Sequence, residues 1–241
     1  MKRASYAMNM HPRHRLLRHV CVGLVAACAS LAVGCSSQSQ LETSPTTDAV
    51  HAAELMPLRA QTQSVTMSSS GVATCTQDRT EAIDPGVYRR SVPGYWVVDM
   101  VVLDDGAIAV VREVDLLEDR RVAYDPPLPI LPGVLKPGEP YEAKAFVSVY
   151  RHTDNVQEAV GEVTATYQLI GKVAGTDDGG PGLYIVRTDR TYKLPLVVVD
   201  LAITSHYRPG VGPIYARIVR TAKLFGLIPA VRIQEVRVIE D

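Results

Sequence analysis

The chain has 241 residues, with 25 basic and 26 acidic side chains and a formal net charge of −1 at pH 7. This balance, without a long basic run, excludes the strongly basic proteins and disfavours nucleic acid as a partner. With four cysteines in a chain of this length, a disulfide-rich scaffold is also excluded.

The first 34 residues have the pattern of an export signal. Residues 1–19 carry five basic side chains and no acid, and residues 20–34 follow without any charge. A basic segment, a short apolar run and small residues at its end are typical of a signal peptide. The apolar run is shorter than the roughly 20 residues that a spanning helix needs. We therefore predict a signal peptide over residues 1–34, with Met8 and Met10 as alternative starts.

The signal ends in Ala32-Val33-Gly34-Cys35, which resembles the bacterial lipobox, although Leu is usual where Ala32 stands. The resemblance implies cleavage just before Cys35, a diacylglycerol on its sulfur, and attachment to a membrane of the cell envelope. Ser36 is compatible with an outer membrane location facing the periplasm. The alternative is an ordinary secretory signal, cleaved near Ala32 or Gly34 before a coincidental cysteine.

Removal of this leader changes both the charge and the cysteine content. The remaining chain has 20 basic and 26 acidic residues, because the five basic residues of the leader are lost. Cys21 and Cys28 leave with the signal, and lipid would occupy Cys35. Only Cys75 remains, so an internal disulfide is excluded. We expect Cys75 to be a semi-buried thiol and not a nucleophile, because no base is near it in sequence.

Residues 35–80 are rich in small and polar side chains and predict a tether. One short helix is possible before Pro57, with Thr47 or Asp48 as its N-cap.

From Val87 onward, apolar and polar residues alternate with the period of a β-strand. Asp104-Asp105-Gly106 indicates a hairpin turn. Six prolines within residues 124–140 disfavour a central strand there. Alternation on one face predicts an antiparallel sheet with one dry side, which must curl or close to hide that side. We therefore expect a single, mainly β domain over residues 81–241: a curved antiparallel sheet or half-barrel of about eight strands, with at most one or two short helices.

Two segments, "YDPPLPILPGVLKPGEPYEAKAFVSV" and "SHYRPGVGPIYARI", flank the long alternating strands. In this order they resemble bacterial envelope proteins with the fold of the outer-membrane lipoprotein carrier. The resemblance covers residues 88–241 and implies a curved half-barrel with an apolar concave face. Members of this group include carriers and accessory lipoproteins.

The alternation places six residues on the candidate apolar face or pocket: Val163, Tyr167, Leu169, Val199, Leu201 and Ile203. Such a face could hold an acyl chain or a lipid-like molecule. Pro209, Gly210 and Gly212 are interpreted as a structural turn, because glycine permits a positive φ.

The sequence contains no recognisable catalytic or metal-binding constellation. His51, His152 and His206 are far apart and lack metal-ligand spacing. Asp99, Asp189 and Asp200 would be catalytic only if a pair faced one groove, and the acidic loop "GTDDGGPG" lacks the ligand spacing of a calcium loop. We therefore expect no enzyme, no cofactor and no metal site.

Two hypotheses for the function remain. The first is a lipid-anchored, non-catalytic envelope protein whose β domain binds an apolar ligand or an envelope partner. The second is a structural subunit of an envelope assembly, with a fully packed domain and no ligand. The expected partners are a membrane, through lipid on Cys35, and a hydrophobic small molecule or envelope protein.

Overall fold

The computed structural model describes residues 43–69, 72–174, 182–224 and 228–238. Almost all of this part of the chain is antiparallel β-structure, as the alternation predicts. Its one helix, α1 (Ala52–Leu55), has four residues. The predicted signal peptide, Cys35 and the acidic loop at 175–181 lie outside the described residues. No helix in these segments is long and apolar enough to cross a membrane.

The strands follow one another along the chain with short connections. Their bounds are β1 (Thr43–Ser44), β2 (Val50–His51), β3 (Gln61–Ser69), β4 (Val72–Asp84), β5 (Val87–Val92), β6 (Trp96–Val102), β7 (Ile108–Asp115), β8 (Arg120–Leu131), β9 (Val134–Leu135), β10 (Tyr141–Arg151), β11 (Gln157–Val173), β12 (Leu183–Lys193), β13 (Val197–Arg208), β14 (Gly212–Leu224) and β15 (Ile228–Val238).

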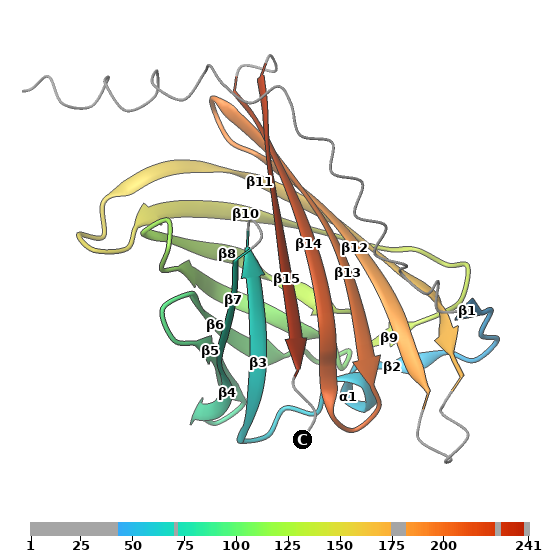
Figure 1. The fold of residues 1–241 in the computed structure, drawn as a ribbon. Helices are drawn as coiled ribbons and strands as arrows, with labels where there is room; N and C mark the ends of the chain where they lie inside the picture. The colour runs from blue at the N-terminus through green and yellow to red at the C-terminus, as the bar shows by residue number, and fades with distance from the viewer. Residues whose placement is uncertain (1–42, 70–71, 175–181, 225–227, 239–241) are drawn as a thin grey trace, which may run out of the picture. The chain divides into compact units, whose positions relative to one another are not determined.

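Twelve of these strands form a closed antiparallel barrel (Figure 1). Each barrel strand pairs with the next one along the chain, and β15 returns to pair with β3. This last pairing joins only Val65–Ser69 to Gln234–Val238, and it is as short as the pairing of β4 with β5. The short strand β1 pairs with the C-terminal end of β11, and β2 pairs with β9 in a separate two-stranded sheet.

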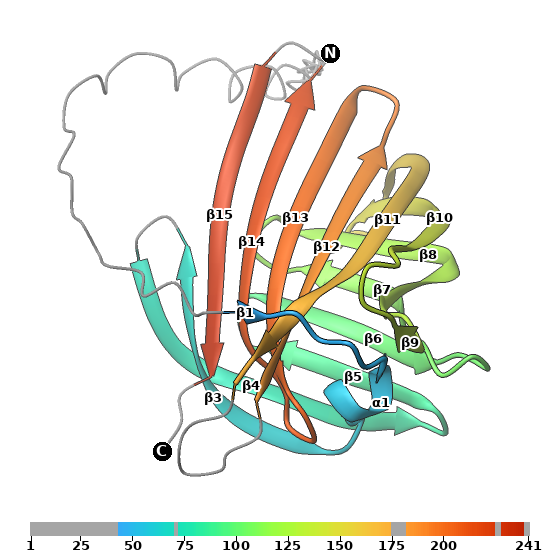
Figure 2. The same cartoon turned by 90° about the vertical axis from the view of Figure 1, so that its right-hand side faces the viewer.

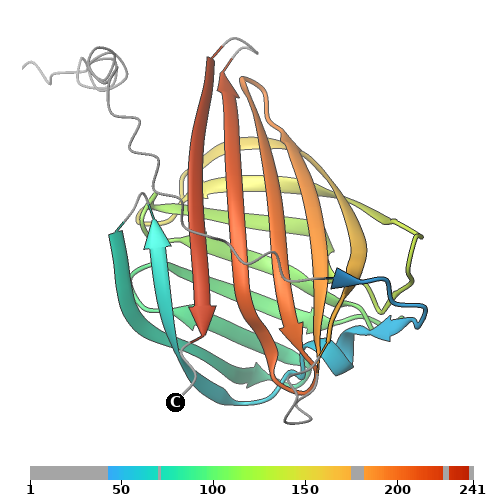
Figure 3. The same ribbon diagram turned by 45° about the vertical axis from the view of Figure 1, so that its right-hand side comes forward.

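The barrel is built from two groups of strands that cross each other. Figure 3 shows β12–β15 running upright in front of the green strands β5–β8, which run across behind them. Figure 2 shows the same crossing from the side, with α1 at the lower end of the barrel. This arrangement leaves the inner faces of the two groups opposite each other.

The predicted half-barrel of about eight strands is therefore wrong in strand number and in closure. The eight strands with clear apolar alternation are present, and β3, β4, β5 and β8 complete the ring. A sheet that closes on itself has no open edge and can hide its dry face without covering helices. The half-barrel that the resemblance implied is wrong for the same reason, because the sheet closes into a full barrel.

The predicted start of the β domain at residue 81 is also too late. Strand β3 and most of β4 lie within residues 35–80, which the sequence assigned to a polar tether. These strands are rich in Ser, Thr and Gln, and part of their inner face is polar. Asp78, for example, is only 3 % exposed. Their composition therefore hides their role, because apolar alternation is the main signal of a half-buried strand.

The proline-rich segment forms a strand despite its composition. Residues 120–125 of β8 pair with β10 on one side, and β8 pairs with β7 on the other. The prolines at 126, 127 and 129 follow the end of the β10 pairing. Pro126 and Pro127 also lie in the register shift of the β7 pairing, between Ala123 and Leu128, and Pro129 pairs with β7 alone. Proline lacks the N–H that a ladder on both sides requires, so it is tolerated at such a local edge.

The segment around α1 closes the lower end of the barrel. Ala52 and Leu55 are fully buried in the main core, and Met56 is 5 % exposed. The backbone N–H of Ala52 donates to the carbonyl of Gly133 over 3.1 Å, and Gly210 N–H donates to the carbonyl of Glu54 over 2.8 Å. Backbone hydrogen bonds thus hold this four-residue helix, which would be unstable on its own.

The turn between β13 and β14 contacts this segment. Gly210 has a φ of 74° and Gly212 a φ of 116°, in the left-handed region that favours glycine. Arg59 donates to the carbonyl of Gly210 over 3.1 Å. The turn at Pro209, Gly210 and Gly212 therefore both reverses the chain and anchors the segment after α1.

Candidate functional site

The six residues of the predicted apolar face all lie on the inner side of the barrel. Val163, Tyr167, Leu169 and Val199 belong to the buried core, and Leu201 packs against it. Ile203 is different, because it lines an internal cavity. The predicted face is therefore mostly filled core, and its end at Ile203 borders the open space.

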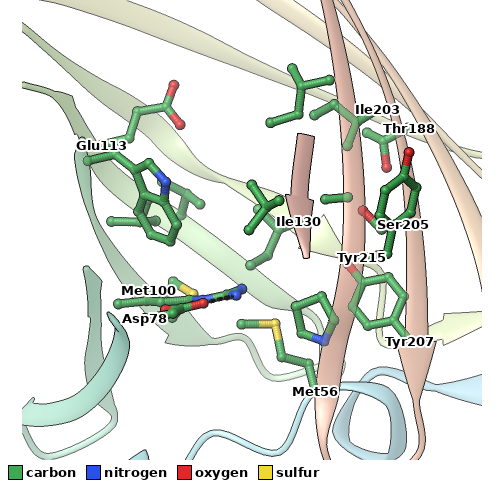
Figure 4. Close-up of a pocket in the computed structure, with 18 of the residues that line it drawn as sticks. Met56, Asp78, Met100, Glu113, Ile130, Thr188, Ile203, Ser205, Tyr207 and Tyr215 are labelled. Carbon is green, nitrogen blue, oxygen red and sulfur yellow. Dashed lines mark hydrogen bonds and ion pairs between the residues drawn. The ribbon is translucent and has the colours of Figure 1, made fainter. Parts of the chain in front are cut away.

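A cavity of about 210 Å³ lies between the two crossing groups of strands. Figure 4 shows Met100 and Glu113 on one side of this space and Ile203 and Tyr207 on the other, with Met56 at its lower end. The side chains that line it are mainly apolar; they include Val98, Met100, Val110, Ile130, Ile203 and Ile218. Trp96, the single tryptophan of the chain, is also part of the wall.

A buried ion pair forms one polar part of the cavity wall. The Nε of Arg90 donates to the two carboxylate oxygens of Asp78 over 3.0 Å and 2.9 Å, and its terminal nitrogen donates to the same carboxylate. The Arg90 guanidinium also lies 5.5 Å from the centre of the Trp96 ring. Burial opposes the charge on Arg90, but Asp78 outweighs this effect and raises the pKa of Arg90 above its ordinary value. Arg90 therefore stays charged and is partnered by Asp78.

A chain of buried hydroxyl groups lies behind the cavity wall and reaches it at Glu113. The hydroxyl of Tyr124 donates to the carboxylate of Glu113 and lies 2.9 Å from the hydroxyl of Tyr192. Desolvation raises the pKa of both phenols, so they are neutral at physiological pH. Burial likewise raises the pKa of Tyr167 to about 12, and its hydroxyl donates to the carbonyl of Pro129.

Arg190 of β12 lies beside this hydroxyl chain and lines the cavity. It is only 6 % exposed, and its Nε is buried without a hydrogen-bond partner in the described part of the chain. Its electrostatic neighbours include Tyr192, Tyr167, Tyr124 and Glu113. Arginine stays protonated at any physiological pH. The cavity wall therefore carries a buried cation whose hydrogen-bonding capacity is only partly used.

The other acidic residues singled out in the sequence do not form a site together. Asp99 is held between Arg89 and Arg112 at 2.8 Å and 3.0 Å. Asp189 pairs with Arg187, and Asp200 accepts from Thr191 and Lys223. Each carboxylate thus has its own local partner, and none of the three lines the cavity.

The histidines and the free cysteine also lie apart from the cavity. His206 stacks edge-on against Tyr215 with ring centres 5.0 Å apart, and none of His51, His152 and His206 lines the cavity. Cys75 is exposed, which corrects the expectation of a semi-buried thiol. Over the described ranges, no group of three or more His, Cys, Asp or Glu residues could hold a metal ion.

No protein-family model, no curated protein and no solved structure matches this chain.

The polar residues of the cavity were missed in the sequence. Asp78 and Arg90 lie in strands that were not recognised, and Glu113 and Arg190 lie in strands that were. In β12 the signal was present, because Arg190 shares its parity with the buried residues Val186, Thr188 and Tyr192. A charged residue on the inward parity of a strand indicates either a buried pair or a binding group.

Proposed function

We propose that this protein is a non-catalytic, membrane-anchored envelope lipoprotein whose barrel binds a small, largely apolar ligand. The observation that supports the proposal is the partly open cavity of about 210 Å³ inside the barrel, which has an apolar wall and a few polar groups. Ligand pockets commonly combine these two features, because apolar surface supplies affinity and placed polar groups fix orientation.

The volume limits the size of the ligand. An empty apolar cavity of about 150 Å³ is enough to bind benzene, and pockets for drug-sized molecules begin near 300 Å³. The cavity described here lies between these values. The proposed ligand is therefore smaller than the long acyl chain suggested by the sequence, unless much of such a chain stays outside.

The two carboxylates of the cavity wall support binding over catalysis. Asp78 is bound by Arg90, and Glu113 accepts a hydrogen bond from Tyr124. A general acid or base must be able to reach a proton on the substrate. Asp78 and Glu113 already accept hydrogen bonds from protein donors, so they are suited to a structural role in the cavity wall.

A second function, a structural subunit of an envelope assembly, has its own support. Phe146 and Val160 lie on the outside of neighbouring strands β10 and β11 and are 61 % and 47 % exposed. Exposed large apolar side chains of this kind mark surfaces that a partner protein can cover. In this case the cavity would be a packing defect and would remain empty.

The lipid anchor belongs to the same proposal. Cys35 would carry the lipid, and the few residues before β1 would connect it to the barrel. The proposed location is the outer membrane, facing the periplasm. A small apolar ligand and a membrane attachment are compatible, because such ligands partition into membranes.

The proposal is tested by identifying what the barrel carries. The protein is purified from membranes in mild detergent, and native mass spectrometry is followed by organic extraction and mass spectrometry of the extract. We expect a small ligand to be released in near-stoichiometric amount.

A matched pair of variants locates the ligand. Ala216→Phe places a ring in the cavity, while Ala202→Phe makes the same change on the outer face of the neighbouring strand. We expect the first to lose the ligand and the second to retain it. Extracts without any ligand, from protein that also binds no added apolar molecule, would favour the structural subunit.

A further inference from the structure

We propose that the ligand of the barrel is a small organic carboxylate whose negative charge pairs with Arg190. The inference deepens the proposed function and rests on it, because it names the chemical class that the same cavity would select. It starts from the observation that the cavity wall contains two buried arginines with different surroundings.

Arg90 has a complete partner within the protein. Its guanidinium binds both oxygens of Asp78 and lies over the ring of Trp96. A bidentate arginine–carboxylate pair uses the donors of the guanidinium and cancels its charge. Arg90 therefore has little capacity left to bind a ligand.

Arg190 has no such bidentate partner within the described residues. The charge of Glu113 acts on Arg190, but the hydrogen bond that this carboxylate accepts comes from Tyr124. Tyr124, Tyr167 and Tyr192 are neutral, since burial raises the pKa of each phenol. They can surround the cation without cancelling its charge.

The Nε of Arg190 is a buried polar atom without a hydrogen-bond partner within the described residues. Burying such an atom without a partner destabilises the fold. Buried unpartnered groups are rare in native proteins and often belong to functional sites. A bound anion would supply the missing acceptor and place a negative charge directly against the guanidinium.

The geometry of the cavity also fits the rest of the ligand. A planar guanidinium donates two parallel N–H groups to a carboxylate. Apolar side chains of β6, β7 and β13, including Met100, Val110 and Ile203, line the same space and suit a short hydrocarbon chain. Scaled from the six carbons of benzene in about 150 Å³, the cavity has room for about eight non-hydrogen atoms. Hexanoate has this size.

The first experiment compares three head groups on the same chain in the wild-type protein. Hexanoate, 1-hexanol and hexylamine are titrated into delipidated full-length mature protein. Trp96 reports binding directly, because it is the single tryptophan and lines the cavity. Isothermal titration calorimetry measures the same affinities without a probe. We expect hexanoate to bind at least about tenfold more tightly than hexanol, since hydrogen bonds to charged groups are the strong ones, and hexylamine to bind least.

The second experiment removes the cation. Arg190→Met keeps an apolar side chain of similar length, and we expect hexanoate to lose about tenfold or more in affinity while hexanol is unaffected. Arg121→Met is the matched control. The Nε of Arg121 is also buried without a partner, but this guanidinium lies 4.3 Å from the centre of the Tyr150 ring and outside the cavity wall. We expect this control to bind hexanoate as the wild type does.

The outcomes separate the inference from the proposed function. Equal affinities for hexanoate and hexanol in the wild type would overturn the role of Arg190 and leave a binding barrel. Failure of all three head groups, at chain lengths from four to ten carbons (the range around the size limit above), would overturn the binding function itself.

If Arg190→Met does not fold, Arg190→Lys provides the second variant, because it keeps the charge but loses the planar pair of donors. An unchanged preference for hexanoate in Arg190→Lys would contradict a bidentate contact.

Discussion

Gly161 is the residue at which β11 and the end of β12 come closest. A Cβ built at this position would overlap the carbonyl oxygen of Lys193 and would lie 3.0 Å from the side chain of Leu194. The obstacle is backbone, which cannot rotate away as a flexible side chain can. Glycine is therefore required here by the close approach of two strands, although its own φ is ordinary.

We predict that Gly161→Ala destabilises the barrel by about 1–3 kcal/mol, the usual cost of forcing extra volume into a packed position. For a protein of this size the Tm would fall by roughly 2–4 °C for each kcal/mol. Thermal unfolding followed by circular dichroism measures the effect. Val160→Ala is the control, because Val160 is 47 % exposed on the outer face. Equal stability of the Gly161→Ala variant and the wild type would show that the strands can move apart at no cost.

Single residues also explain the change of apolar parity along β15, between Ile233 and Val236. The pairing of β15 with β14 is continuous, without a bulge. Ile233 is 43 % exposed on the outer face, whereas Val236 lines the cavity. The change of parity therefore comes from an apolar residue on the outer face and not from an irregularity in the pairing.

At the scale of elements, the turn between β7 and β8 connects two sides of the barrel. Glu118 in this turn binds Arg220 of β14 over 2.7 Å and Arg232 of β15 over 3.0 Å. The backbone N–H of Leu116 donates to the carbonyl of Tyr95 over 2.8 Å. The turn is therefore fixed by a backbone hydrogen bond to the β5–β6 turn and by ion pairs to β14 and β15.

The charge on Glu118 makes this contact sensitive to acid. Burial opposes the charge, but the hydrogen bond from Arg220 and the positive charges of Arg220, Arg120 and Arg232 lower the pKa of Glu118 below its usual value. A carboxylate with a lowered pKa in the folded state stabilises the fold above its unfolded pKa. This contribution is lost as the pH falls through the folded pKa.

We predict that Glu118→Gln lowers the free energy of unfolding at pH 7, and that the difference from the wild type shrinks toward pH 3. Urea unfolding at several pH values measures this difference. Glu139→Gln is the control, because the Glu139 side chain is 70 % exposed and its contact with Lys136 is 3.4 Å long. Exposed ion pairs contribute little to stability. A deficit of Glu118→Gln that is the same at pH 3 and pH 7 would rule out the charge as its cause.

At the scale of the whole molecule, the barrel closes by the return of the last strand to the first described long strand. Strands β3 and β15 are distant in sequence, and their pairing completes a ring in which all other neighbours are consecutive. Closure removes the open edges that would otherwise attract other chains. It also creates an interior in which a polar group can be kept from water.

The location of the whole molecule depends on Cys35. We predict that the mature protein extracted from membranes has an N-terminal Cys35 carrying a diacyl or triacyl modification. Intact-mass measurement detects the added lipid, and the Cys35→Ala variant is expected to lose both the added mass and the membrane attachment. An unmodified N-terminus at another residue would identify a secreted barrel without a lipid anchor.

The sequence by itself determined the β class, the antiparallel pairing, the β6–β7 hairpin and the inward parity of Val163, Tyr167 and Val199. These features follow from local alternation and turn residues, which neighbouring positions in the chain report directly. Only the tertiary structure decided that the sheet closes with twelve strands, because the inner faces of β3, β4 and β5 are partly polar and lack an apolar alternation. It also decided that the Nε of Arg190 is buried at a cavity without a hydrogen-bond partner, whereas Arg90 pairs with Asp78 on the adjacent strand β4. An inward-facing charge gives the same sequence pattern in both cases, because the cavity beside Arg190 is enclosed by strands that are far apart in sequence.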